Sequence, residues 1–234
     1  MKRVLFIGDG KHDIGKPEWP SDEAFPARGV VPLLAGRVAA IDCPASVAMP
    51  WAHPKLARFP VVRPTKTRGY EAKLRAARLH VERGTLEVEG IVCVVDEDND
   101  AERRELPGVA DGLATERCPI AGGVAVRSIE AWTLGASTAL ADVLGISPQE
   151  LRRACPSGSV EDLYDGSGKH KLQSKMLLNA LTERFRHRSA SLELREEVAA
   201  QTDIAELAKN CPEGFAPFVA ALRAAFGPVP AVVK

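Results

Sequence analysis

The densest group of chemically capable side chains lies at positions 96–100, where four carboxylates occupy five consecutive residues. They are Asp96, Glu97, Asp98 and Asp100. The five residues before them, 91–95, are wholly apolar, which predicts a strand buried on both faces, as in a parallel sheet. Carboxylates this close repel one another, and a divalent cation held by oxygen ligands is the simplest way to offset that repulsion. Because alternate residues of an extended segment point to the same side, the three aspartates could converge on one ion.

Two other interpretations of this acidic stretch compete with a metal site at the end of the strand. An EF-hand loop does not fit, because the sixth position would be Ala101 instead of glycine and the twelfth Pro107 instead of glutamate. A charged turn exposed to water remains the simpler alternative.

A second acidic motif follows the first predicted strand, at residues 3–7. Asp9 stands between Gly8 and Gly10 in a turn, and Asp13 follows three residues after Gly10. Ligands of open parallel sheets bind at the carboxyl ends of the strands. If the two strands are neighbours, Asp9 would join Asp96 and Asp98 around Mg²⁺ or Mn²⁺, with coordination positions left for water and phosphate. The alternative is a tight turn in which Asp13 caps a short helix.

Two further groups are candidates for the same site. Glu130 lies in the first turn of a predicted helix, where it could bind the metal, pair with Arg127 or complement the helix dipole. A basic cluster follows in and after a loop rich in glycine and serine, and it could contact phosphate or simply be solvated. Its members are Lys169, His170, Lys171 and Lys175.

Helices and strands alternate around these motifs, which predicts an α/β fold with a mostly parallel sheet flanked by helices. The predicted strands are 3–7, 91–95 and 120–126, with a further short strand at 59–62 inside an otherwise irregular segment, 41–64. The predicted helices are one beginning near Val31, 69–83, one at 101–114 broken by Pro107-Gly108, and one that Ser128 caps and Gly145 ends.

The remainder of the chain is predicted to be mostly helical. Helices are expected from Ser147-Pro148, at 175–186, at 191–202 and in a closing segment that contains Phe215 to Phe226. We therefore expect an α/β core at 1–145 and a helical C-terminal extension at 146–234, packed on that core.

Composition narrows the class of protein. The chain has 234 residues, with 31 basic and 31 acidic side chains, so nucleic-acid binding would need a local basic patch. Its five cysteines form no CxxC pair, which excludes a disulfide framework and a zinc site of that pattern. No signal peptide or membrane-spanning run is evident, so we expect a cytoplasmic protein with no membrane partner.

Three motifs together carry a family resemblance: GDGxxD at 8–13, DxDxD at 96–100 and VRSIEAW at 126–132. In this order and spacing the chain resembles TOPRIM-like proteins, the topoisomerase-primase fold. It looks closest to small bacterial families related to overcoming-lysogenization-defect-type nucleases and phage-defence proteins. The resemblance implies a mostly parallel sheet between helices, with Asp9 in the position of the usual glutamate. It also implies that Asp96 and Asp98 hold Mg²⁺, with Asp100 in support.

The expected function is metal-dependent phosphodiester cleavage, as by a nuclease acting on DNA or RNA in anti-phage defence. Asp9, Asp96, Asp98 and Lys171 would be catalytic, and Glu130 would complete the metal shell. One alternative is a non-catalytic subunit that binds a protein partner, such as an ATPase of a defence complex, or a second copy of the chain. Another is a haloacid-dehalogenase-like phosphatase with Asp96 as nucleophile, although Asp100 departs from that motif.

Overall fold

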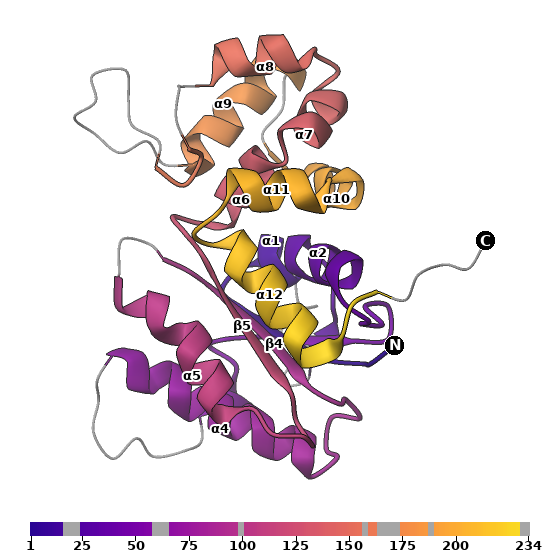
Figure 1. Cartoon of the computed structure of the whole chain (residues 1–234), viewed down its shortest axis with the longest axis vertical. Helices are drawn as coiled ribbons and strands as arrows, with labels where there is room; N and C mark the ends of the chain where they lie inside the picture. Colours follow the sequence, from indigo (N-terminus) through magenta and orange to yellow (C-terminus); the bar gives the residue numbers. More distant parts are fainter. Residues whose placement is uncertain are drawn as a thin grey trace.

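The computed structural model describes residues 1–15, 24–57, 66–97, 101–155, 159–162, 174–186 and 190–229. Within these ranges five strands form one sheet in the order β2-β3-β1-β4-β5. Figure 1 shows β4 and β5 side by side in this sheet. Four of the five strands are parallel, namely β1 (Leu5–Gly8), β3 (Val47–Pro50), β4 (Ile91–Asp96) and β5 (Ile120–Ala125). The edge strand β2 (Phe25–Pro26) is antiparallel to β3. The predicted α/β class with a mostly parallel sheet is confirmed.

Helices cover both faces of the sheet, and the strands are apolar on both sides for that reason. Alternate residues of each strand enter two separate cores, so that Phe6 and Val92 lie in one, and Ile7 and Cys93 in the other. The first core is completed by α2 (Val30–Val38) and α12 (Phe215–Phe226), and the second by α4 (Lys66–Glu82) and α5 (Leu106–Leu113).

The glycine pair in the middle of β5 has a packing cause. A Cβ at Gly122 would lie 2.7 Å from the Ala110 side chain of α5, and one at Gly123 would lie 2.6 Å from the Phe218 ring of α12. Both helices therefore approach this strand more closely than any side chain would permit.

A third core lies beyond the carboxyl ends of the strands and is made by helices alone (Figure 1). Its helices are α6 (Ile129–Gly135), α7 (Ser137–Leu144), α8 (Pro148–Ala154), α9 (Ser174–Arg186) and α10 (Leu192–Gln201). Three further short helices are α1 (Lys11–Ile14), α3 (Pro54–Ala57) and α11 (Ile204–Asn210), and a 3₁₀ helix, η1, spans Ala101–Glu105. None of the helices in the described ranges is both long and apolar enough to cross a bilayer.

The local predictions were wrong in four places. The segment 41–64 is not irregular, because β3 lies within it as an inner strand whose proline, Pro50, stands at the strand end. Pro107 does not break a helix but occupies the first turn of α5. The helix expected from 129 to 145 divides at Ala136, where Asn210 Nδ2 donates to the Gly135 carbonyl at 2.8 Å. Helix α11 was not predicted at all.

Two of the sequence predictions concern segments that these observations do not decide. The short strand expected at 59–62 lies outside the described residues. The boundary expected at residue 145 stays a prediction, although α12, far beyond it, packs directly on β5.

Candidate functional site

The two acidic motifs meet at one edge of the sheet. β1 and β4 are parallel neighbours, with Ile7 opposite Cys93, so Asp9 and Asp96 leave the sheet at the same edge. β5 lies next to β4, with Asp96 opposite Ala125, and leads directly into α6. We call this edge, with the residues that follow the three strands, the carboxyl edge.

The guanidinium of Arg103 lies between the ends of β1 and β4. Arg103, on η1, donates from Nη1 to the Asp96 carbonyl oxygen at 2.6 Å. The same Nη1 atom lies 3.8 Å from Asp9 Oδ2. A cationic group therefore already sits between the two strand ends, where the sequence predicts a cation.

Asp96 also holds the start of α6. Its Oδ1 accepts the backbone N–H of Ile129 at 2.9 Å, which satisfies one of the donors that a helix start leaves open. Ser128 stands at the N-cap position as predicted, but its side chain makes no capping hydrogen bond. The cap is thus supplied by a carboxylate from the neighbouring strand, a contact that the local sequence around Ser128 does not contain.

Glu97 is buried in a network of internal donors. Arg104 Nε donates to its Oε1 at 2.7 Å, and the Arg127 backbone N–H donates to its Oε2 at 3.1 Å. Burial raises the pKa of Glu97, but these hydrogen bonds outweigh burial and hold the pKa below its usual value. Arg127 itself has a φ of 72°, a left-handed conformation that is costly for a residue with a side chain.

Glu130 forms a buried ion pair instead of facing solvent. Arg195 Nη1, from α10, lies 2.7 Å from Glu130 Oε1, and the Arg195 and Glu130 side chains are only 1% and 8% exposed. Burial raises the pKa of Glu130, yet the hydrogen bond from Ser128 and the charge of Arg195 together hold it below normal. The oxygen that was predicted to bind metal therefore already has a cationic partner.

Asp13 is the ionisable group at this edge whose pKa departs furthest upward. Its Oδ2 accepts the Gly10 N–H at 2.8 Å, and its side chain is buried. Burial and the nearby charges of Glu130 and Asp9 raise its pKa from 3.8 to about 7, against the opposing effects of Gly10 and Arg195. The alternative in which Asp13 stabilises the tight turn describes this geometry.

Few of the predicted metal ligands lie in the part of the carboxyl edge that the structure describes. Among the described residues, no three side chains of the types that bind metals come together. Asp98 and Asp100 lie outside the described residues, as do Lys169, His170 and Lys171, while Lys175 is exposed on α9. Asp9 and Asp96 remain at the edge, and Mg²⁺ is commonly held by one or two carboxylates completed by water and phosphate. The oxygen-only donors match that hard cation and not zinc.

The chain has no match among protein-family models, and neither a curated protein nor a solved structure matches it significantly. Its TOPRIM-like resemblance stays a prediction based on the three motifs.

Two residues that shape this edge, Arg103 and Arg195, were not singled out from the sequence, and a third, Asp13, was given no role in the site. Arg103 had a signal, since it follows the acidic stretch within a few positions and carries the opposite charge. Arg195 had a weaker one, an arginine beside Leu194 on a helix that also buries Val198. Asp13 was noted but not assigned to the site, because nothing in a sequence reports the burial that raises its pKa.

Proposed function

We propose that the carboxyl edge carries out Mg²⁺- or Mn²⁺-dependent hydrolysis of phosphodiester bonds in DNA or RNA. The observation that supports this proposal is the placement of Asp9 and Asp96 at the ends of adjacent parallel strands, with the Arg103 guanidinium between them. Ligand sites of open α/β sheets lie at this edge. The TOPRIM-like motifs, taken as a resemblance, lead to the same chemistry.

In this proposal each side chain has a limited role. Asp9 and Asp96 hold the cation, which when bound polarises the scissile phosphate and lowers the pKa of water. Arg103, on the adjacent η1, would donate to phosphate oxygens. Asp13, with a pKa of about 7, is protonated in about half of the molecules at neutral pH and can give up or take up a proton next to Asp9.

Cleavage assays on end-labelled single- and double-stranded DNA and RNA, with Mg²⁺ or Mn²⁺, test this function. Asp9→Asn and Asp96→Asn should each lower the rate by about a hundredfold or more, the scale of losing one charge-stabilising group. The amide introduced by Asp96→Asn still offers an oxygen to the Ile129 N–H, so this variant keeps its fold. Asp111→Asn, an exposed acid on α5, is the matched control. Equal cleavage by wild type and both edge variants would contradict the proposal.

A second candidate is a non-catalytic subunit that binds a protein partner. It is favoured by the internal contacts of three of the acids, since Asp96 caps α6, Glu97 binds Arg104 and Arg127, and Glu130 pairs with Arg195. On this view the acids stabilise the turn regions around the edge. Wild-type protein that neither cleaves any of the four substrates nor binds Mn²⁺ in calorimetry would support this candidate over the enzyme.

A further inference from the structure

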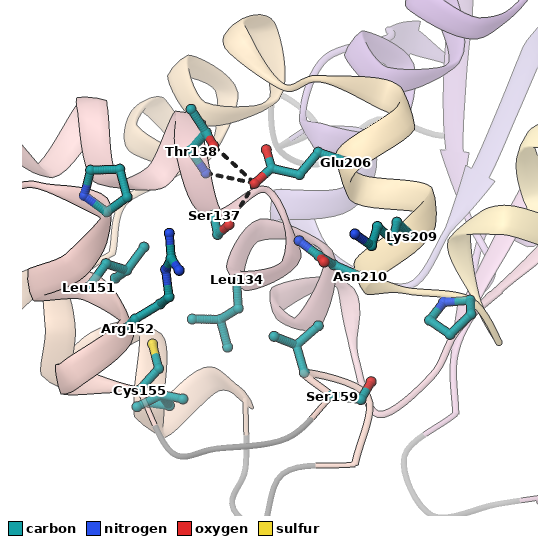
Figure 2. Close-up of a pocket in the computed structure, with 14 residues that line it drawn as sticks. Leu134, Ser137, Thr138, Leu151, Arg152, Cys155, Ser159, Glu206, Lys209 and Asn210 are labelled. Carbon is teal, nitrogen blue, oxygen red and sulfur yellow. Dashed lines mark hydrogen bonds between the residues drawn. The ribbon is translucent and has the colours of Figure 1, made fainter.

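A second concave site lies in the helical part of the molecule, between α6, α7, α8, α9 and α11 (Figure 2). Its volume is about 800 Å³, within the range of pockets that hold small molecules. None of the carboxyl-edge acids discussed above contributes to its lining, so it is a separate site from the proposed phosphodiesterase centre.

The floor of this pocket is aliphatic. Leu134, Leu151, Val160 and Leu177 line it, together with Pro148 and Pro212. Leu134 projects into the centre of the space (Figure 2). The described lining contains no aromatic ring on which a base or another planar group would stack. A flexible hydrocarbon chain suits such a surface better than a nucleobase does.

Two cationic side chains stand on different walls of the pocket. Arg152 comes from α8 and Lys209 from α11, and both extend toward the space between the helices (Figure 2). Within the described part of the chain neither has an ion-pair or hydrogen-bond partner, and both are accessible to solvent. By contrast, Arg103, Arg104 and Arg195 all contact carboxylates.

The carboxylate in the described lining, Glu206, is engaged through one of its two oxygens, while no described group donates to its buried Oε2. Glu206 Oε1 accepts hydrogen bonds from Ser137 Oγ at 2.6 Å and from Thr138 N and Oγ1 at 3.2 and 3.0 Å. These bonds fix the start of α7 to α11, and the bond from Asn210 to Gly135 fixes α11 to α6. The α11 wall, which carries Lys209, is therefore held in place before any ligand arrives, which lowers the entropic cost of binding.

We propose that this pocket binds a small aliphatic anion, such as a medium-chain carboxylate, as a single dissolved molecule. The hydrocarbon chain would lie on the leucine floor, and the carboxylate would pair with Arg152 and Lys209. Two cationic side chains against the single Glu206 carboxylate leave the described lining with a net positive charge. That charge and the apolar floor together favour an anion with a hydrocarbon chain over a neutral or cationic chain. The proposal is independent of phosphodiester chemistry at the carboxyl edge.

Isothermal calorimetry with decanoate below its micelle concentration tests the proposal directly. Decanol and decyltrimethylammonium serve as neutral and cationic probes of equal chain length. The Arg152→Gln/Lys209→Gln variant should bind decanoate about tenfold more weakly or worse, because two charged donors are lost. Arg153→Gln/Lys175→Gln, which removes the same two residue types from exposed positions outside the lining, should bind decanoate as wild type does.

Cys155 offers a local readout, since its half-buried thiol belongs to the lining and burial raises its pKa. Bound decanoate should slow the reaction of Cys155 with a maleimide, measured on the Cys155 peptide by mass spectrometry. The proposal is overturned if the double variant binds decanoate as tightly as wild type. It is also overturned if the three probes bind equally or if decanoate does not bind.

Discussion

The charged side chains of the carboxyl edge and of the helical pocket differ in burial and in pairing. At the edge, Glu97 and Glu130 are buried and each has an arginine partner at 2.7 Å. In the pocket, Arg152 and Lys209 are accessible to solvent and have no such partner among the described residues. A ligand at the edge would therefore compete with existing internal contacts, such as that of Arg103 with Asp9, whereas Arg152 and Lys209 have no contact to give up within the described part of the chain.

Breaking the buried pair at the edge should have the largest effect on stability. Arg195→Met leaves the Glu130 carboxylate buried without its partner, which we expect to lower the free energy of unfolding by about 3–5 kcal/mol. Urea denaturation followed by circular dichroism measures the change. The Arg195→Met/Glu130→Met variant should recover much of the loss, because the charge itself is then absent. A single variant as stable as wild type would show that the pair is not buried in solution.

The raised pKa of Asp13 makes stability depend on pH in the opposite direction from the neighbouring glutamates. Between pH 3.8, its ordinary pKa, and about 7, the folded chain holds a proton that the unfolded chain has released. The contribution of Asp13 to the free energy of unfolding is therefore fully present below pH 3.8 and is lost as the pH rises toward 7. The slope cannot exceed about 1.4 kcal/mol per pH unit.

Asp13→Asn removes that slope. Denaturant midpoints measured from pH 4 to 8 should fall with rising pH in wild type more steeply than in the variant. Glu97 and Glu130, whose pKa values are lowered, contribute the other sign, since their stabilisation is lost only as the solution becomes acidic. If the midpoints of wild type and Asp13→Asn change with pH in parallel, folding does not raise the pKa of Asp13.

The sequence predicted the frame of this edge better than its contacts. The apolar run 91–95 and the segment 120–126 were predicted as strands because buried parallel strands leave a pattern that is local in sequence. The same reasoning placed Asp9 and Asp96 at the strand ends. It could not place Arg195, which reaches Glu130 across 65 positions, nor show that Asp96 caps α6 across 33. β3 was missed because its four residues lie among prolines.

The cap that Asp96 provides should contribute a smaller amount. Asp96→Ala removes the acceptor for the Ile129 N–H, and loss of a helix cap costs about 1 kcal/mol. Asp96→Asn keeps an acceptor at the same place, so its free energy of unfolding should lie closer to wild type. If the two variants are equally stable, the Asp96 carboxylate does not stabilise the start of α6. A ligand that binds Asp96 would then not have to compete with the Ile129 N–H.

The smallest effect is expected at the rim of the same network, where Arg104 contacts two carboxylates. Arg104 Nε lies 2.7 Å from Glu97 Oε1, and the Glu97 side chain is 11% exposed. Arg104 Nη1 lies 3.0 Å from Glu213 Oε2, and the Glu213 side chain is 58% exposed. Glu213→Gln should change the free energy of unfolding by less than about 1 kcal/mol, because an exposed pair gains little in water. Glu97→Gln should cost about 1.5–3 kcal/mol, the range for hydrogen bonds to a charged group. The ratio of the two changes, measured by urea denaturation at low and high salt, separates buried from surface charge. Equal losses of stability would mean that water reaches Glu97 as freely as Glu213. Glu97 would then not be a buried, paired charge, and the carboxyl edge would differ less from the pocket, whose cationic side chains are accessible to solvent.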